Sequence, residues 1–224
     1  ARDHERADMN GSFLGVVLLA LSLSAGRAVA AGPEVFTHPV TLAELQTILA
    51  EPNAALSKAA GLRGQFVQKK YLAELPKPLL SSGRFVFSKD HGLCWQTEKP
   101  FASEFVLSGE QMISRSGSSE SRLSTQGQPA LALVSRLFLA LVRLDAQPLA
   151  EYFQLFAQAG SPWQLGLKAR DAGVARAVRE GLLSGRAQVE RVHITDGNGD
   201  RAEITFSASE VLTTLSADER KLFP

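Results

Sequence analysis

The sequence of 224 residues lacks a surplus of charge of either sign. Lys and Arg number 24 against 23 Asp and Glu, which leaves a formal net charge of +1. A nucleic-acid-binding protein normally concentrates positive charge on one surface, and no basic cluster stands out along this chain. The composition therefore predicts that nucleic acid is not a partner.

Cysteine is almost absent. Cys94 is the only one, so it cannot form an intrachain disulfide, and it lies between Leu93 and Trp95 in a strand-like run. A lone thiol flanked by large apolar residues is typical of a core position. We expect Cys94 to be buried and unreactive.

The short sequence motifs of several enzyme classes are missing too. The chain has no G-x-S-x-G, no H-E-x-x-H, no phosphate-binding loop and no G-x-G-x-x-G after a strand. The four histidines are scattered: His4, His38, His91 and His193. We predict a protein that is not an enzyme and has no cofactor. A lipid hydrolase stays an alternative, because a catalytic triad meets only in the fold.

One segment imitates a calcium-binding loop. Asp196, Asn198 and Asp200 have the right spacing, but Arg201 stands where the loop needs glycine, and Ser207 stands where it needs glutamate. The Asp-Gly-Asn-Gly composition is instead typical of a hairpin turn. We predict a turn here and no metal site.

The N-terminus has the pattern of a secretory signal peptide. An apolar run from Phe13 to Ala25 precedes Ala28-Val29-Ala30, a small-residue site for signal peptidase. The run is shorter than the ~20 residues that span a bilayer. We predict a signal peptide at residues 1–30, cleavage after Ala30 or one residue later, one domain at 31–224 and a periplasmic location. An uncleaved anchor helix is the alternative.

The rest of the chain reads as helix, strands, helices, strands. A capping box at Thr41–Glu44 begins an amphipathic helix that Pro52 interrupts. Two groups of short strands flank a helical middle, which predicts one curved antiparallel sheet with helices on one face. The predicted helices are 54–60, 129–144 and one from 148 to about 152; the predicted strands are 64–71, 83–88, 93–97, 104–107, 111–115, 120–123, 163–167, 174–183, 188–195 and 201–207.

Apolar side chains exceed what an ordinary surface helix needs. In residues 129–144 they cover most of the helix circumference, whereas a surface helix needs a stripe of ~100°. A deeply buried core helix is one interpretation. The other is a helix that packs on the sheet with one side and faces a hydrophobic cavity with another. The large apolar residues of this helix include Leu131, Leu133, Leu137 and Phe138.

Two neighbouring strands carry a matching apolar face. Phe85 and Phe87 share one face of their strand, and Leu93 and Trp95 share one face of the next. Across a hairpin these pairs can line the same side of a sheet. They are either core residues or the lining of a cavity that an unclosed sheet leaves open.

The residues that carry these features resemble the outer-membrane lipoprotein carrier (LolA-like) family. The likeness rests on F-x-Q at 66–68, a strand begun by Gly83, L-x-W at 93–95, Pro100, and Gly127-Gln128-Pro129 before an apolar helix. It continues through residues 163–167 and 199–206 and so covers most of the chain after residue 62. The chain looks like a divergent member.

The resemblance implies an incomplete, half-open antiparallel β-barrel, with helices covering its open side and a hydrophobic cavity between them. By position it places Leu93 and Trp95 on the sheet side of this cavity and Leu131 and Leu133 on a lid helix. With the residues singled out above, the predicted cavity set is Phe85, Phe87, Leu93, Trp95, Leu131, Leu133, Leu137 and Phe138.

The resemblance also implies a polar contact at the lid edge. The family has an arginine near the turn before the L-x-W strand that helps to hold the lid closed, and Lys89 stands at the matching position. Lysine keeps the charge but loses the planar guanidinium fork. We expect lid control here to differ from that of the family.

The predicted function is that of a monomeric periplasmic carrier for the acyl chains of a lipoprotein or another lipid, including a glycolipid. It would shuttle this ligand towards the outer membrane between an inner-membrane donor complex and an outer-membrane acceptor. The main alternative is a structural or assembly module of the envelope whose half-barrel is filled by its own side chains. A receptor tethered to the outer membrane is disfavoured, because no cysteine follows the apolar run for lipid attachment.

Overall fold

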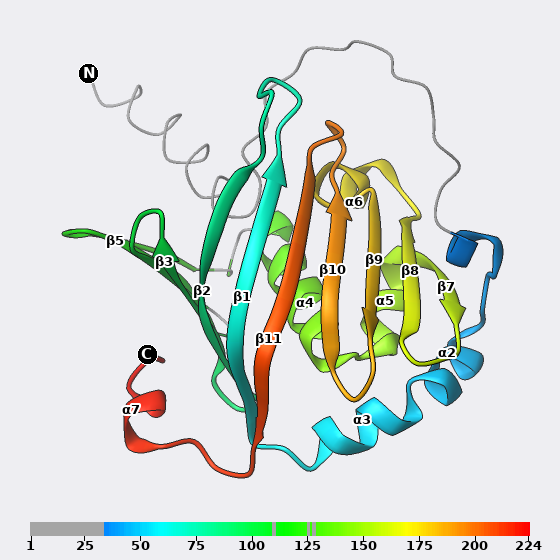
Figure 1. The fold of residues 1–224 in the computed structure, drawn as a ribbon, viewed down its shortest axis with the longest axis horizontal. Coiled ribbons are helices and arrows are strands. Elements are labelled where there is room, and N and C mark those ends of the chain that lie inside the picture. Colours follow the sequence, from blue (N-terminus) through cyan, green and yellow to red (C-terminus); the bar gives the residue numbers. More distant parts are fainter. Residues whose placement is uncertain (1–33, 109–110, 125, 127–128) are drawn as a thin grey trace.

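The computed structural model describes residues 34–108, 111–124, 126 and 129–224 (Figure 1). The predicted signal peptide, residues 1–30, lies outside this part. The helical segments are η1 (Glu34–Thr37), α2 (Leu42–Ile48), α3 (Ala50–Ser57), α4 (Pro129–Arg143), α5 (Ala146–Tyr152), α6 (Ala172–Ala177) and α7 (Ala217–Arg220). The strands are β1 (Gly61–Tyr71), β2 (Leu79–Ser88), β3 (Gly92–Lys99), β4 (Ser103–Leu107), β5 (Gln111–Ser116), β6 (Ser119–Ser124), β7 (Phe153–Gln158), β8 (Trp163–Ala169), β9 (Glu180–Gly185), β10 (Val189–Thr195) and β11 (Arg201–Leu212).

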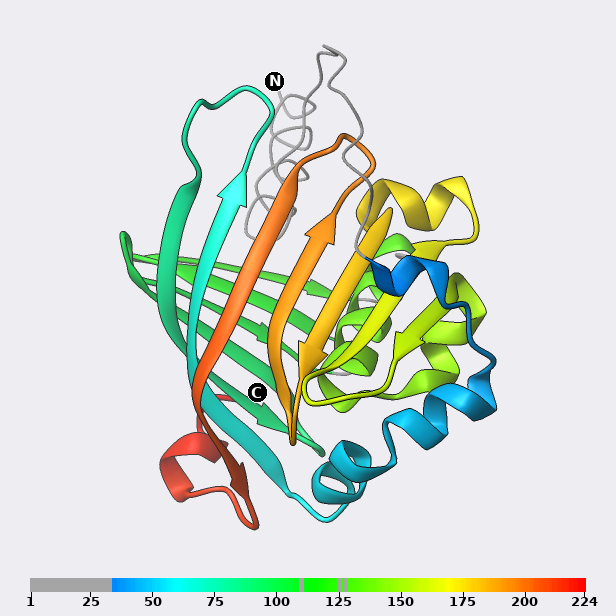
Figure 2. The same ribbon diagram turned by 45° about the vertical axis from the view of Figure 1, so that its right-hand side comes forward.

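All eleven strands belong to one antiparallel sheet. Their order is β6-β5-β4-β3-β2-β1-β11-β10-β9-β8-β7, so the first and last groups of strands meet where β1 pairs with β11. The two outermost strands, β6 and β7, do not pair with each other, and the barrel stays open. The sheet curls around α4, with α5 beside it (Figures 1 and 2). The predicted half-open barrel is confirmed.

The two faces of the first strand group are both apolar. Phe85 pairs with Trp95 and Phe87 with Leu93 across β2 and β3, and these side chains face the concave side. Val86 pairs with Cys94 and faces the other way, because neighbouring strand residues point to opposite faces. The apolar side chains of each face therefore need a separate element that shields them from water.

Glycines of the family motif let these strands approach closely. A Cβ on Gly83 would lie 1.9 Å from the carbonyl oxygen of Gln96 on β3. Gly92 opens β3 with φ of 113°, and a Cβ there would lie 2.0 Å from the carbonyl oxygen of Leu107. Any other residue at either position would push the strands apart.

The C-terminal segment covers the convex face. Leu215 and Phe223 form a buried cluster with Cys94 and its neighbours on β2, β4 and β5, and α7 lies on the outer side of the sheet (Figure 2). Arg63 of β1 holds this segment: Nη2 lies 2.8 Å from Glu210 Oε2 and Nη1 lies 3.0 Å from Glu219 Oε1.

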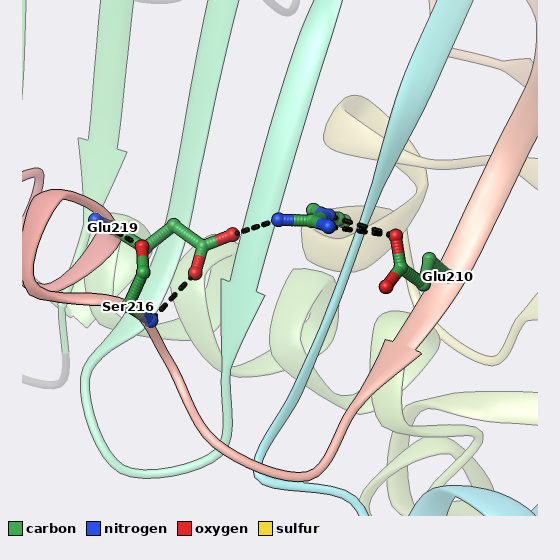
Figure 3. Close-up of polar contacts among 4 residues, drawn as sticks. Glu210, Ser216 and Glu219 are labelled. Atoms are coloured by element: carbon green, nitrogen blue, oxygen red, sulfur yellow. Dashed lines mark hydrogen bonds and ion pairs between the residues drawn. The ribbon is translucent and has the colours of Figure 1, made fainter.

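A capping box fixes the Glu219 carboxylate. Ser216 N donates to Glu219 Oε2 at 2.8 Å, and Glu219 N donates to Ser216 Oγ at 3.2 Å (Figure 3). The same carboxylate therefore caps α7 and pairs with Arg63 on β1. The Glu219 side chain thus links the structure of α7 to the contact of the C-terminal segment with the sheet.

Several local predictions agree with the structure. The Thr41–Glu44 capping box begins α2, and residues 196–200 form the turn between β10 and β11, where Asp196 Oδ1 accepts from Asn198 N at 2.9 Å and Asp200 N at 3.0 Å. Cys94 is fully buried, as expected. The capping box and the turn depend on hydrogen bonds within a few residues, whereas the burial of Cys94 also depends on Leu215 and Phe223 of the C-terminal segment.

The predicted strand at 174–183 begins too early, and only its part from Glu180 onward is a strand. Asp171 caps a short helix there, accepting from Gly173 N at 2.7 Å and Val174 N at 3.1 Å, and β9 starts only at Glu180. A six-residue helix is too short to show a helical period. The prediction that Pro52 interrupts the first helix is also wrong. Helix α2 already ends at Ile48, and α3 begins at Ala50 rather than 54, because Pro52 fits its first turn. The strand β7 was not predicted.

Candidate functional site

An aromatic cluster lines the centre of the concave face. The Phe66 and Trp95 rings stack with centroids 3.8 Å apart, and Phe206 meets Phe85 edge-on at 5.2 Å. Phe66 lies on β1 and Phe206 on β11, so the cluster sits where the two strand groups join. Trp95 and Phe206 are only half-buried.

Helix α4 contacts both halves of the concave face. Leu137, Ala140 and Leu144 belong to a large core with α2, α5 and β7–β10. Leu139 and Val142, on another side of the helix, pack against the cluster of β1–β5. Both interpretations of the apolar circumference are thus partly right: α4 is a buried core helix on one side and covers the aromatic cluster with another.

A cavity of about 70 Å³ lies beneath α4, between the two halves. Its wall is apolar except for the side chain of Gln188. A water molecule takes up ~30 Å³ of liquid, so the cavity as it stands is far smaller than an acyl chain. The lining residues are Leu56, Leu62, Phe85, Leu93, Trp95, Leu141, Val142, Leu183, Gln188, Val189, Val192, Ile194, Ile204 and Phe206.

The structure distributes the predicted cavity residues over several places. Phe85, Leu93 and Trp95 line the cavity, and Phe87 lies in the same cluster at its edge. Leu137 is buried in the larger core, and Leu133 packs against that core, both away from the cavity wall. The side chains of Leu131 and Phe138 lie outside the described residues.

Most of the wall was not predicted from the sequence: of its fourteen residues, the predicted set contains only Phe85, Leu93 and Trp95. Ile204 and Phe206 of β11, with Val192 and Ile194 of β10, line the cavity from the second strand group. Alternation of apolar residues in 204–206 gave a signal for one face of β11, but nothing local indicated that this face meets that of β3. Val142 was recognised only as one apolar residue of the helix.

Lys89 contacts α4 through its main chain. Its Nζ donates to the carbonyl oxygen of Ser57 in α3 at 3.1 Å, while its own carbonyl oxygen accepts from Arg143 Nη2 of α4 at 2.9 Å. The guanidinium that holds the helix to the sheet thus comes from the helix itself. The Arg143 guanidinium carbon also lies 5.7 Å from the centroid of the Phe87 ring.

The described residues offer neither a metal-ligating cluster nor an accessible thiol. In the described part of the chain, no group of three or more His, Cys, Asp or Glu side chains could hold a metal ion. Burial raises the pKa of the Cys94 thiol to about 12, and the nearby Glu104 carboxylate adds to this effect. A thiol with so high a pKa is a poor nucleophile at neutral pH.

The geometry defines the class of the protein: an open half-barrel with an apolar interior under a helix. The sequence profile of the family described as "outer membrane lipoprotein carrier protein LolA-like" matches residues 46–210. The chain belongs to this family. No curated protein matches the sequence. Within the described ranges, no helix is long and apolar enough to cross a membrane.

Solved structures with a similar fold have low sequence identity. A LolA superfamily protein from Nitrosomonas europaea is 14% identical with a TM-score of 0.46, covering 80% of this chain and 97% of its own. A putative outer membrane lipoprotein-sorting protein domain from Vibrio parahaemolyticus is 9% identical with a TM-score of 0.44, covering 81% and 99%. LprF from Mycobacterium bovis is 15% identical with a TM-score of 0.40, covering 80% and 98%.

Proposed function

We propose that this protein is a periplasmic carrier that binds the acyl chain of a lipoprotein or another lipid between α4 and the concave face of the sheet. It carries this ligand towards the outer membrane, receiving it from an inner-membrane donor and passing it to an outer-membrane acceptor. The observation that carries the proposal is the apolar cavity at the junction of the two strand groups, covered by α4 and with Leu56 of α3 in its wall.

The chemistry of the wall suits a hydrocarbon ligand. Leucine, isoleucine, valine and aromatic side chains make up the wall apart from Gln188. Burying a methylene contributes ~0.8 kcal/mol, so each additional methylene of an acyl chain adds to the affinity without any polar contact. Such a wall selects for chain length and against charge.

Binding requires α4 to move. The cavity of about 70 Å³ must expand, and the covering helix is the element whose displacement enlarges it. Val142 and Leu139 are half-buried, so the contact of α4 with the β1–β5 cluster is less extensive than its contact with the larger core. We propose that α4 tilts away from the aromatic cluster while its other side stays packed.

The small cavity also favours a second candidate function. A half-barrel filled by its own side chains could serve as a structural or assembly module of the envelope, without a ligand. The two proposals differ in one measurable property, which is whether an acyl chain reaches Trp95.

The two tryptophans provide the test. Trp95 lines the cavity, whereas Trp163 is buried in the larger core, where its Nε1 donates to the carbonyl oxygen of Arg186 at 2.7 Å. Dibromostearic acid quenches tryptophan only at short range. We expect it to quench the Trp163→Phe variant, which retains Trp95, and to leave the Trp95→Phe variant unquenched.

Equal quenching of both variants, or of neither, contradicts acyl binding at this site and favours the self-filled module. Thermal unfolding of both variants shows whether the substitutions leave the fold intact. The export proposal has a separate test: the intact mass of the protein from a periplasmic extract should correspond to a chain that begins at residue 31.

A further inference from the structure

A second, open groove adjoins the apolar cavity. It has a volume of about 410 Å³ and lies at the end of the half-barrel where β1 begins, between α3 and the C-terminal end of α4. Unlike the cavity, it has charged residues in its wall, and it has several polar ones; together these are Gln46, Asn53, Ser57, Lys89, Arg143 and Asp145.

The groove and the cavity are adjacent. Leu56 lines both of them. Arg143 of the groove directly follows Val142 of the cavity on α4, and Phe87 of the groove follows Phe85 of the cavity along the same face of β2. A molecule whose chain fills the cavity would therefore place its other end in the groove when that end leaves on this side.

Most N–H donors of the two cations in the groove form no hydrogen bond to another described residue. Lys89 Nζ donates to Ser57 O, and Arg143 Nη2 donates to Lys89 O, whereas an ammonium has three donors and a guanidinium five. Among the described residues neither forms an ion pair with a carboxylate; the Asp145 carboxylate accepts from Gln147 N at 3.2 Å as the cap of α5. The charged side chains of the groove sum to one net positive charge.

An asparagine side chain whose oxygen has no hydrogen-bond partner lies in the same wall. The side-chain oxygen of Asn53 in α3 is buried and has no hydrogen-bond partner. A buried acceptor without a partner is costly, and only a donor such as a ligand hydroxyl or N–H would remove that cost, so this oxygen itself does not bind an anion. The groove thus combines two cations with an unsatisfied polar group beside an apolar cavity.

We propose that this groove binds the anionic headgroup, a phosphate or a carboxylate, of the amphiphile whose acyl chain occupies the cavity. The inference rests on the proposed function and specifies its ligand class: an anionic lipid or an acylated molecule with an acidic group near the chain. Lys89 and Arg143 bind the anion.

The test compares two lysolipids with the same palmitoyl chain. Palmitoyl-lysophosphatidylglycerol has a net negative charge, and palmitoyl-lysophosphatidylcholine is zwitterionic. In calorimetric titrations of the full chain below the micelle concentration, we expect the anionic lipid to bind about tenfold more tightly, as one charge-assisted contact allows. Added salt should reduce this ratio, because the groove is open to solvent.

Variants show which residues cause the preference for the anionic lipid. Replacing both cations, Lys89→Gln with Arg143→Gln, should bring the ratio of the two affinities to about one. Losing the Arg143–Lys89 bond also loosens α4, but this changes both affinities alike and leaves their ratio to report the headgroup contact. Lys58→Gln and Arg136→Gln remove a cation from the same helices outside the groove and should keep the ratio.

Each outcome has one meaning. Equal binding of both lipids by the unmodified protein overturns the headgroup site and leaves the acyl cavity standing. Binding of neither overturns the proposed function itself. If inorganic phosphate alone binds, and the double variant loses that binding without any change in the lipid ratio, the groove is a site for a free anion and the lipid headgroup proposal is wrong.

Discussion

Arg143, in the last turn of α4, donates a hydrogen bond from Nη2 to the main-chain carbonyl oxygen of Lys89 at 2.9 Å. Lys89 follows β2 directly, so this bond ties the end of the helix to the rim of the sheet. Any motion of α4 away from the aromatic cluster at this end must break it. The contact is therefore where the energetics of cavity opening can be probed.

Arg143→Ala should loosen the C-terminal half of α4. A charge-assisted hydrogen bond at an exposed site contributes about 1 kcal/mol, so opening should become about fivefold more frequent. Hydrogen exchange of the α4 amides measures this directly. Arg136→Ala is the matched control, because Arg136 pairs with Glu151 of α5 rather than with the sheet. Equal exchange in the two variants would contradict the role of Arg143.

Phe206→Ala should weaken acyl binding and the fold together. Phe206 packs against both concave clusters and meets the Phe85 and Trp95 rings edge-on. Because it is half-buried, we expect a loss of about 2–3 kcal/mol in the free energy of unfolding, below the range for a fully buried phenylalanine. Urea titration measures this loss, and quenching by dibromostearic acid measures binding.

Val67→Ala is the control for this substitution. Val67 lies on β1 beside Phe66 but is 48% exposed, so its loss should change the free energy of unfolding by less than about 0.5 kcal/mol and leave quenching intact. A similar effect of both substitutions would show that Phe206 has no special place in the cavity.

The Cys94 thiol should make the protein less stable at alkaline pH. Folding raises the thiol pKa from 9.0 to about 12, chiefly by burial, so the unfolded chain releases this proton first. The contribution of the neutral thiol is complete below pH 9 and is lost as the pH rises towards 12, by ~1.4 kcal/mol for each pH unit.

Cys94→Ala removes this dependence. Lysine and tyrosine titrate in the same range, so the measured quantity is the difference in the free energy of unfolding between the original protein and the variant. We expect this difference to change in favour of the variant as the pH rises above about 9. A difference that is independent of pH would show that the thiol is accessible to water.

Glu219→Ala should expose Cys94. The substitution removes both the α7 capping contact and the ion pair with Arg63, and α7 holds Leu215 and Phe223 over the thiol. Loss of a cap costs ~1 kcal/mol, which corresponds to about fivefold faster labelling by N-ethylmaleimide. Glu210→Ala removes only the other partner of Arg63 and should label more slowly than Glu219→Ala; the reverse order would contradict the role of the cap.

The family motif was readable because it consists of local requirements. Gly83 and Gly92 stand where a side chain would collide with the neighbouring strand, and Trp95 follows at a fixed spacing on the concave face. Such constraints act within a hairpin and leave a pattern in consecutive residues. The strand β7 had no comparable pattern, because its residues 155–157 are all buried and show no alternation.

The predicted lid residues were less accurate than the predicted sheet residues. In an almost wholly apolar helix, periodicity cannot indicate which side faces which neighbour, so Leu133 and Leu137 were assigned to the cavity while Leu141 and Val142 line it. The carbonyl acceptor of Lys89 was unpredictable for another reason, since every residue has one and only the fold brings Arg143 to it.

The sequence by itself determined the capping box at Thr41, the turn at Asp196–Asp200 and the alternating strands, because each arises from the properties of neighbouring residues in the chain. The tertiary structure alone decided which face of α4 covers the aromatic cluster, how β11 completes the cavity and how the C-terminal segment covers the convex face. These depend on contacts between residues far apart in the chain, and a free energy shared among many such contacts leaves no mark at any single position.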